Sequence, residues 1–494
     1  MSQDKNTLEN KIPVGGVRTR FAPSPTGYMH VGNLRTALYT WLIARNQKGT
    51  FILRIEDTDQ GRLVEGATET IYQTLAECSL NHDEGPDVGG PVAPYIQSER
   101  QGTYSVFAQD LLEKGSAYRC FCDKERLDSL RAKDPTAGYD GHCANLSPEE
   151  EKAKLEAGTP FVIRQRIPKE GETTFSDAIF GNITVENAGL DDQVLVKADG
   201  MPTYNFANVV DDHLMGITHV VRGSEYLSST PKYNLLYKAF GWEIPTYVHC
   251  SPVMRDSQNK MSKRHGDPSY EDLRDQGFLT TAILNYVALL GWSPRGEIAE
   301  KEFFTLEELV EHFDLEGLSK SPAIFDMEKL THFNALHLRA LPPEAFAQVI
   351  APYVRETMKN YPVEAVAPLL QARCEKLTDI GEKVDFFDEL PSYEAELFTN
   401  KKAKTNPEIA AEMLKISIEA LESISDWTME AVHDILMNLA KEKEVKNATL
   451  LWPVRIAVAG KLVTPGGAVE ICHILGKDEC LARLKTGLAK LDCQ

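Results

Sequence analysis

The chain has no apolar run long enough to cross a membrane. Its longest such stretch, ILNYVALLGW at 283–292, falls well short of the roughly 18 residues that a spanning helix needs. The N-terminal residues MSQDKNTLENKIPVGG are polar and lack the apolar core of a secretion signal. Both absences predict a cytoplasmic protein.

Regularly spaced cysteines and an excess of positive charge are absent too. The nine cysteines stand at irregular spacings in 494 residues, unlike the disulfide framework of a small secreted domain, which leaves free thiols or a metal site. With 53 Lys and Arg against 73 Asp and Glu, the net charge is -20, so the chain is not expected to coat nucleic acid non-specifically. A shaped RNA partner that meets a local basic face is compatible with this charge.

The composition that is present is typical of a multidomain globular enzyme. Apolar residues make up 42% of the chain and charged residues 26%, with no low-complexity tract. A chain of 494 residues exceeds what one hydrophobic core holds, and roughly 150 residues per domain predicts about three or four structural units.

The N-terminal part has the pattern of a parallel α/β sheet. A strand at 17–22 is followed by the turn PSPTG, a helical pattern through Leu34 and Leu42, and the strand TFILRIEDTD at 50–59. Strand, helix and strand in this order form a βαβ unit. Because ligands bind at the carboxyl ends of such strands, we expect PSPTG and the acids that begin at Glu56 to lie at a binding site.

The pattern changes twice further along the chain. Between 97 and 203 shorter mixed elements indicate an insertion. Strand patterns return in TYNFANVVDD at 203–212 and THVVRGSEY at 218–226, where we expect the sheet to resume. From about 270 onward the pattern is helical.

Two motifs carry phosphate chemistry. In PSPTGYMHVGN at 23–33, glycines permit close approach of the backbone to phosphate, and His30 begins a helix whose N-terminus attracts anions. KMSKR at 260–264 places two lysines and an arginine around a serine, close to Arg255. Close cations repel one another, so a bound polyanion explains them, although KMSKR alone is equally compatible with a solvated loop.

Together these motifs resemble the HIGH-type and KMSKS-type signatures with which class I aminoacyl-tRNA synthetases bind ATP. In this chain they read His30-Val31-Gly32-Asn33 and Lys260-Met261-Ser262-Lys263-Arg264. A wider set of strings is similar to the bacterial glutamyl-tRNA synthetases, in order from about 17 to 295, with a fainter helical similarity to the end. These strings are RFAPSPTGYMHVGN, RIEDTD, DEGPDVGGPVAPYIQSER, PTYNFANVVDDHLMGITHVVRGSEY and KMSKRHG.

The resemblance implies an α/β fold with a Rossmann-like parallel-sheet catalytic domain at 1–96 and 204–254. An α+β acceptor-stem-binding insertion would occupy 97–203. The KMSKS loop and an all-α stem-contact bundle would follow at 255–340, and an all-α anticodon-binding domain at 341–494.

The implied reaction is the ligation of glutamate to tRNA(Glu) in two steps. Glutamate attacks the α-phosphate of ATP to give glutamyl-adenylate and pyrophosphate, and the terminal adenosine of the tRNA then takes the acyl group. Mg²⁺ would accompany ATP. His30, Lys260 and Lys263 would stabilise charge that develops on the α-phosphate. The implied nucleotide contacts are Pro23, His30, Gly32, Asn33, Glu225, Met254, Lys260, Ser262, Lys263 and Arg264.

The glutamate contacts also come from the resemblance. Arg20 and Arg222 would bind the side-chain and backbone carboxylates, and Glu56 would face the α-amino group, since anions need forked cations and an ammonium needs an acid. The pocket would be completed by Ala22, Ser24, Tyr204 and Asn208. A neutral glutamine would leave buried charge unpaired in such a site.

A cysteine cluster leaves two interpretations open. Cys120, Cys122 and Cys143 supply three thiols, with Tyr139 and His142 nearby, which is enough for a tetrahedral zinc site. Some glutamyl-tRNA synthetases carry such a zinc and others have lost it. Some of them place a histidine two residues after the third cysteine. This chain has Asn145 at that position, so the fourth ligand would be Tyr139, His142 or water. The alternative is three reduced cysteines in a small hydrophobic subdomain.

Other functions fit the sequence less well, and a truncated glutamyl-queuosine-type paralogue would lack the C-terminal region altogether. The related glutaminyl enzymes build their anticodon-binding part from β-barrels, whereas the pattern here is helical from about 340 to 490. A tRNA-binding protein that had lost catalysis would not need His30 and Lys263, and a small-molecule nucleotidyltransferase would not need the C-terminal helices. Basic runs at 401–405 and 441–447 are either tRNA contacts or solvated helix ends. The family expectation is a monomer.

Overall fold

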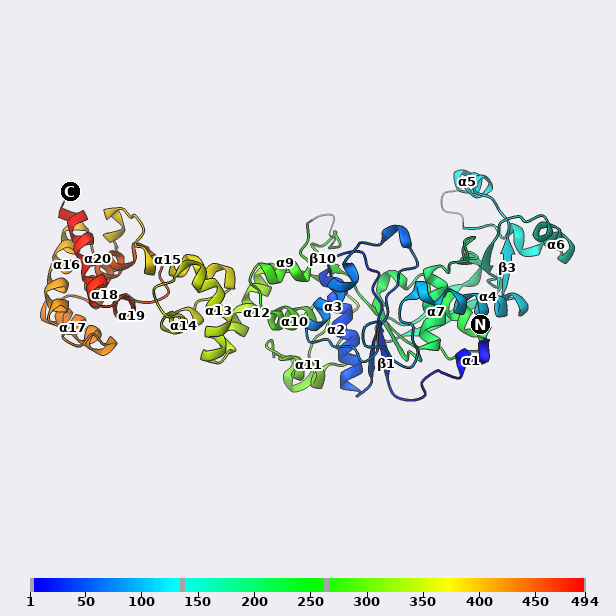
Figure 1. Ribbon diagram of the computed structural model, residues 1–494, viewed down its shortest axis with the longest axis horizontal. Helices are drawn as coiled ribbons and strands as arrows, with labels where there is room; N and C mark the ends of the chain where they lie inside the picture. Colours follow the sequence, from blue (N-terminus) through cyan, green and yellow to red (C-terminus); the bar gives the residue numbers. More distant parts are fainter. Residues whose placement is uncertain (1–3, 134–137, 262–265, 493–494) are drawn as a thin grey trace. The chain divides into compact units, whose positions relative to one another are not determined.

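The computed structural model describes residues 4–133, 138–261 and 266–492, which fall into two compact units (Figure 1). Residues up to 273 together with 283–327 form the first unit, and 274–282 together with 328–494 form the second. Among the helices of the described ranges, none is long and apolar enough to span a membrane.

Six strands form the main sheet of the first unit, in the order β2-β1-β8-β9-β5-β6. Neighbouring strands are parallel from β2 to β5, whereas β6 runs antiparallel to β5. The predicted parallel sheet is therefore confirmed, and the strands expected at 17–22 and 50–59 are β1 and β2. In sheet order the strands are Thr50–Leu53, Arg18–Phe21, His219–Gly223, Thr246–Cys250, Glu172–Asp177 and Gly181–Glu186.

Helices pack on both faces of this sheet. Successive side chains of a strand point to opposite faces. In β1 the Thr19 hydroxyl donates to the Thr40 carbonyl of α2 (Val31–Asn46), while the Arg20 guanidinium binds Asp212 of α7 (Tyr204–Leu214). The strand thus holds α2 on one side and α7 on the other.

The segment 203–212 is a helix and not the strand that its sequence suggested. Val209 and Val210 gave it an apolar, β-branched appearance, but α7 buries nearly all of its residues and packs with α4 (Gln101–Glu113) and α8 (Thr230–Phe240) in one core. The helical period is nevertheless present, because Phe206, Val210 and Leu214 recur four residues apart, and the adjacent valines concealed it. The neighbouring prediction, THVVRGSEY, is confirmed as β8.

The segment 97–203 contains two kinds of sheet. β3 (Ala117–Cys120), β4 (Val162–Gln165) and β7 (Val194–Val196) form a separate antiparallel sheet. The hairpin of β5 and β6 instead extends the main sheet, where Asp177 pairs with Tyr247 of β9. The end of β5 therefore reaches the interior of the first unit.

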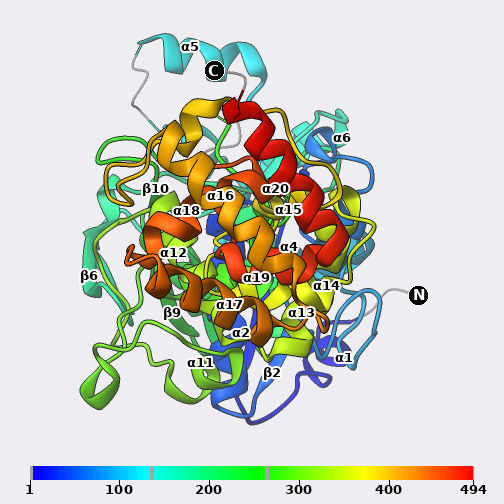
Figure 2. The same cartoon turned by 90° about the vertical axis from the view of Figure 1, so that its left-hand side faces the viewer.

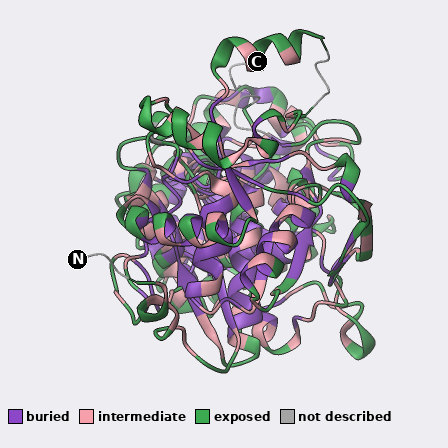
Figure 3. Cartoon of the chain, turned by 90° about the vertical axis from the view of Figure 1, so that its right-hand side faces the viewer, coloured by how far each residue is buried: buried purple, intermediate pink, exposed green. Residues whose placement is uncertain are grey.

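The remaining elements of the first unit are mostly short helices. Figure 3 shows its buried residues gathered on the central strands and helices, whereas α5 has no buried residue. Two short strands, β10 and β11, pair in parallel. The elements are α1 Lys5–Glu9, α3 Ala67–Glu77, α5 Lys124–Lys133, α6 Pro148–Glu156, α9 Tyr270–Asp275, α10 Thr280–Leu289, α11 Leu306–His312, β10 Val253–Met254 and β11 Ala323–Ile324.

The second unit is helical, as the sequence predicted. Helices α16, α18 and α20 pack along one another (Figure 2), and one hydrophobic core extends from Leu338 to Leu491. Its helices are α12 Met327–Ala340, α13 Pro343–Thr357, α14 Val363–Gln371, α15 Ile380–Asp388, α16 Pro407–Glu422, α17 Met429–Glu442, α18 Asn447–Ala459, α19 Ala468–Leu475 and α20 Lys477–Asp492.

Candidate active site

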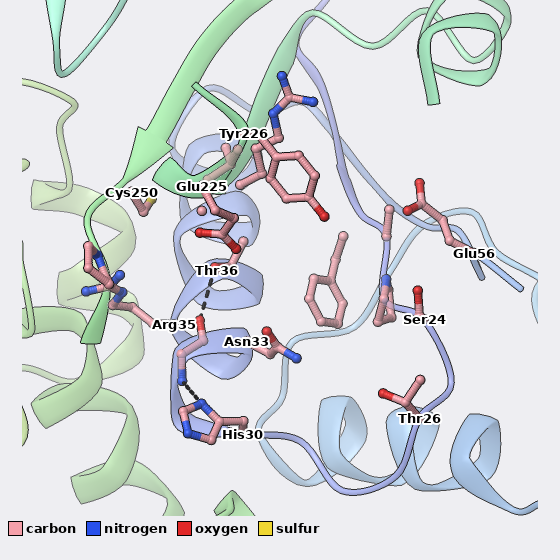
Figure 4. A pocket seen from close by; sticks show the side chains of 18 of the residues that line it. Ser24, Thr26, His30, Asn33, Arg35, Thr36, Glu56, Glu225, Tyr226 and Cys250 are labelled. Atoms are coloured by element: carbon pink, nitrogen blue, oxygen red, sulfur yellow. Dashed lines mark hydrogen bonds between the residues drawn. The ribbon is translucent and has the colours of Figure 1, made fainter. Parts of the chain in front are cut away.

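A cavity of about 450 Å³ lies at the carboxyl ends of β1, β8 and β9 (Figure 4). This is the edge of the sheet where a ligand was expected. Residues predicted for the nucleotide and for the amino acid line it together: Arg20, Ala22, Pro23, Ser24, His30, Gly32, Asn33, Glu56, Tyr204, Arg222, Glu225 and Lys260. Asn208 and Met254 do not line the cavity, and Ser262, Lys263 and Arg264 lie outside the described residues.

One end of the cavity is formed by the N-terminus of α2. His30 caps this helix, and its Nδ1 accepts a hydrogen bond from the Gly32 N–H at 3.1 Å (Figure 4). An acceptor nitrogen carries no proton, so the neutral ring holds its proton on Nε2. An imidazole donor and the positive end of a helix dipole therefore meet at one place, which suits an anion.

Lys260 reaches the same cavity from the predicted KMSKR loop. Its ammonium lies 3.5 Å from the Glu225 carboxylate, and both side chains are more than half exposed. The backbone of Lys260 forms a bridge with Met254, and the Met261 side chain is buried in the first unit. Met254 therefore supports the start of the loop from outside the cavity.

Arg20 lies beneath the other end of the cavity, with only 3% of its surface exposed. Its Nε donates to one Asp212 oxygen at 2.9 Å, its Nη2 to the other at 3.3 Å, and its Nη1 to the Val221 carbonyl at 3.2 Å. Arg20 and Arg54 hold the pKa of Asp212 below its usual value, although burial alone would raise it. Asp212 is therefore a charged partner that fixes Arg20 in place.

Glu56 is linked to the same network through Arg54. Arg54 is fully buried and donates to Glu56 and to Asp212, each at 2.8 Å. Burial raises the pKa of Glu56, while Arg54 and Arg20 act in the opposite direction. Figure 4 shows Glu56 and Ser24 on one wall of the cavity, across from Glu225 and Tyr226.

Arg222 is bound quite differently. Its guanidinium carbon lies 4.7 Å from the ring centre of Tyr233, with the rings of Tyr226 and Tyr247 at 5.1 and 5.4 Å. Its Nε donates to His249, which is a neutral partner, and within the described residues no carboxylate forms an ion pair with it. A buried cation among aromatic faces without a protein counter-ion is suited to binding an anionic ligand.

The remaining predicted residues divide between the cavity and its support. The Tyr204 ring lines the cavity 5.3 Å from the ring of Tyr226. The Asn208 side chain donates to the Tyr204 carbonyl at 2.7 Å and so supports the first turn of α7. Of the acids after β2, Glu56 and Asp59 line the cavity, whereas Asp57 accepts hydrogen bonds from Ser98.

Several residues of this site were not predicted from the sequence. Asp212 and Arg54 neutralise and orient the predicted residues, Tyr226 lines the cavity, and His249 contacts Arg222. The two adjacent acids within the apolar string TYNFANVVDD were a usable signal, because such residues are rarely buried unless they are paired. His249 gave no signal, since its role depends on the strand beside it.

The cysteine cluster lies between β3 and the turn at 142–145. The sulfurs of Cys120, Cys122 and Cys143 all lie within 4.8 Å of one another. The Tyr139 hydroxyl contacts the first two at 3.3 and 3.4 Å, and it accepts a hydrogen bond from the Cys143 N–H at 2.9 Å. Three converging thiols and one phenolic oxygen match the number and type of donors in a tetrahedral zinc site.

The two basic runs of the second unit lie at helix ends. Residues 401–405 form the turn that precedes α16, where Asn400 pairs with Thr405. Residues 441–447 join the end of α17 to the start of α18. Both places suit solvated lysines as well as contacts to a polyanion.

The chain matches two protein families. Residues 16–332 match the family described as tRNA synthetases class I (E and Q), catalytic domain, and residues 345–488 match the family described as anticodon binding domain.

Individual relatives agree with this match. Glutamate–tRNA ligases of Clostridium novyi (strain NT) and Clostridium tetani (strain Massachusetts / E88) are each 57% identical over 480 residues, which is 96% of this chain and 98% of theirs. Among solved structures, the chain is similar to the crystal structure of a glutamate tRNA ligase from Elizabethkingia meningosepticum CCUG26117 in complex with its amino acid. The two sequences are 35% identical, and the TM-score is 0.89 over 97% of this chain and all of that one. Glutamate-tRNA synthetase from Elizabethkingia anophelis gives a TM-score of 0.87 at 34% identity.

Proposed function

The chain belongs to the glutamate–tRNA ligases of the class I tRNA synthetases, and we propose that its glutamate and ATP react in the cavity at the ends of β1, β8 and β9. The reaction has two steps. The α-carboxylate of L-glutamate attacks the α-phosphate of ATP, which yields glutamyl-adenylate and pyrophosphate. The 3′-terminal adenosine of tRNA(Glu) then takes the glutamyl group and releases AMP.

One observation supports the assignment of both substrates to this cavity. A single space has an anion-binding helix N-terminus with His30 at one end, and the buried Arg20, Glu56 and Arg222 at the other. The substrates of the first step require such a pair of sites side by side, because the glutamate carboxylate must reach the α-phosphate.

The helix end of the cavity is assigned to ATP. His30 donates from Nε2 to a phosphate oxygen, and the positive end of the α2 dipole, near Gly32 and Asn33, faces the same charge. Lys260 leaves Glu225 to reach the triphosphate. Pro23 is assigned to the nucleotide, and so, from the sequence motif, are Lys263, Ser262 and Arg264, which lie outside the described residues. Mg²⁺ accompanies ATP and is held largely by its phosphates.

The other end is assigned to glutamate. Arg20 and Arg222 bind its two carboxylates and Glu56 binds its ammonium, with Ala22, Ser24 and Tyr204 around them and Asn208 behind Tyr204. Glutamate offers one carboxylate to each of these arginines, whereas glutamine offers a carboxylate to only one of them. Glutamate brings one net negative charge, and glutamine brings none. Glutamine therefore leaves a buried cation uncompensated, which supports selection against it.

ATP–pyrophosphate exchange tests the assignment. With tRNA(Glu) present, we expect exchange with glutamate and none with glutamine. Arg222→Gln should raise the KM for glutamate by roughly 100-fold, since it removes a charged hydrogen-bond donor from the substrate. Exchange with glutamine in place of glutamate, or an unchanged KM in R222Q, would contradict the assignment.

We propose a structural zinc ion at the cysteine cluster. Cys120, Cys122 and Cys143 would hold it as thiolates, with Tyr139 as the fourth ligand, and bound zinc would tie β3 to the turn at 142–145. Elemental analysis should find about one zinc per chain, and Cys143→Ser should lower this content. Metal-free protein with the cluster intact would favour three reduced cysteines.

We propose that tRNA is bound along the rest of the chain. The anticodon-binding match at 345–488 supports an anticodon domain at 341–494. The segments 97–203 and 255–340 are assigned to the acceptor stem and to stem contacts, flanking the catalytic segments 1–96 and 204–254. The chain acts as a monomer, so sedimentation equilibrium should give the mass of a single chain.

A further inference from the structure

Arg222 is held by a neutral acceptor. Arg222 on β8 stands opposite His249 on β9, and its Nε donates to His249 Nε2 at 3.1 Å. Its Nη2 donates to the Thr230 hydroxyl at 3.0 Å. Of its five N–H donors, Nη1 keeps both, so the guanidinium is fixed in orientation while donors remain for a ligand.

His249 is in turn held by Asp177 at the end of β5. The distance from His249 Nδ1 to Asp177 Oδ2 is 2.6 Å, and both side chains are fully buried. The same oxygen accepts from the His249 backbone N–H, and the other accepts from the N–H groups of Ile179 and Phe180. Because three backbone N–H groups donate to it, the carboxyl is an ionised acceptor, and His249 Nδ1 must therefore carry the proton in the contact with it.

This arrangement leaves His249 Nε2 without a proton, which is the state needed to accept from Arg222. Burial lowers the pKa of His249 and so favours the neutral ring. Burial would raise the pKa of Asp177, but hydrogen bonds from His249 and from the following backbone hold it below its usual value. The negative charge of the Asp177–His249 pair therefore stays on Asp177, with the imidazole ring between it and Arg222.

A comparison with Arg20 explains why the side chain that contacts Arg222 is a histidine and not a carboxylate. Arg20 is bound directly by the Asp212 carboxylate, which it shares with Arg54 and which offsets part of its charge. A carboxylate in the place of His249 would do the same to Arg222, whereas a neutral imidazole fixes the guanidinium and leaves its charge for the substrate.

We propose that His249 is a positioning residue for Arg222, with Asp177 fixing the tautomer that this role needs. The inference rests on the proposed function, in which Arg222 binds a glutamate carboxylate. It also gives the β5 hairpin of the 97–203 segment a part in glutamate binding, because Asp177 comes from that segment.

Two substitutions at position 249 separate positioning from packing. His249→Gln places an amide oxygen near the former Nε2 and retains an acceptor for Arg222. His249→Asn retains a donor toward Asp177 but loses that acceptor. We expect H249N to raise the KM for glutamate roughly 10- to 100-fold and H249Q to raise it clearly less, with the KM for ATP changed less than about twofold in both.

Asp177→Asn tests the tautomer. The amide would donate to His249 Nδ1, moving the ring proton to Nε2, where it would face the Arg222 N–H. A buried aspartate that orients a histidine is known to act in this way in serine proteases. We expect D177N to match H249N in the KM for glutamate, and the double variant to add little to either. His219→Asn, on neighbouring β8 and outside the cavity, is the matched control with an unchanged KM.

A measurement on the unmodified chain keeps the inference testable if a variant fails to fold. In ¹⁵N-histidine spectra at neutral pH, His249 should appear as the neutral Nδ1–H tautomer. An imidazolium or an Nε2–H tautomer would overturn the inference. Equal KM values for H249N and H249Q, while R222Q still raises it, would overturn the positioning role alone. An unchanged KM in R222Q would instead overturn the proposed function.

Discussion

Arg54 is the residue on which the buried charges of the first unit depend. It is fully buried and binds the carboxylates of Glu56 and Asp212. Removal of one partner from a buried ion network leaves uncompensated charge, which destabilises a fold by about 3–5 kcal/mol. Arg54→Met should therefore lower the free energy of unfolding of the first unit by about this amount, measured by urea denaturation.

Arg45→Met is the matched control for this prediction. Arg45 binds Asp83 at 2.7 Å, but both side chains are partly exposed to solvent. An exposed pair contributes about 1 kcal/mol or less, so R45M should have a small effect. Equal losses in R54M and R45M would show that the buried network does not stabilise the first unit.

Glu56 gives the site a dependence on pH. The ionised carboxylate of Glu56 binds the substrate ammonium, whereas the protonated carboxyl does not. Burial raises the pKa of Glu56, so protonation begins at a higher pH than for an exposed glutamate, whose pKa is about 4.3. As the pH is lowered, the KM for glutamate should therefore begin to increase while the pH is still above about 4.3. Glu56→Gln should have a higher KM at neutral pH and lack this rise; the same pH profile in E56Q would contradict the prediction.

At the scale of elements, the start of α2 combines two roles in His30. As N-cap it satisfies the Gly32 N–H, and as a donor it is assigned to phosphate. His30→Asn keeps a good capping residue but removes the imidazole, whereas His30→Ala removes both. Both variants should lower kcat by roughly 100-fold, or about 3 kcal/mol, with little change in the KM for glutamate.

Thermal unfolding separates the two roles of His30. H30A should lose about 1 kcal/mol of stability that H30N keeps. Full activity in H30N would mean that the cap, and not the imidazole, is what catalysis needs from this position.

Strand ends decide how the other site residues meet. Arg20 is the penultimate residue of β1, Arg222 belongs to β8 and His249 to β9, and the order of these strands in the sheet makes the three neighbours. Helix α7 then adds Asp212 beneath Arg20. No single element holds the site, so its geometry depends on how the sheet is assembled.

At the scale of the whole molecule, the two compact units have separate hydrophobic cores. Calorimetry should therefore resolve two unfolding transitions, since units with their own cores need not unfold together. Glutamate binds only the first unit in the proposed function. At about 100 times its Kd it should stabilise that transition by roughly 2.7 kcal/mol and leave the other unchanged. A shift of both transitions by glutamate alone would argue for a single cooperative unit.

The sequence by itself determined the family and the parallel sheet, and it predicted twelve of the residues that line the cavity. The sheet and the turn follow from local strings, because PSPTGYMHVGN has the pattern of a turn and a helix N-terminus and apolar strands around a helix form a βαβ unit. The family and the lining residues came from the resemblance that these strings carry. The strand prediction at 203–212 was wrong, because Val209 and Val210 gave the segment a β-like appearance although Phe206, Val210 and Leu214 recur at helical spacing.

Only the tertiary structure decided which charges are cancelled and which stay available. Arg20 and Arg222 look alike as residues, yet α7 places Asp212 against the first, and β9 places a neutral His249 against the second. These partners are distant in sequence and come together through strand order and helix packing. The electrostatics of a buried group depend on its spatial neighbours, and its position in the chain does not reveal them.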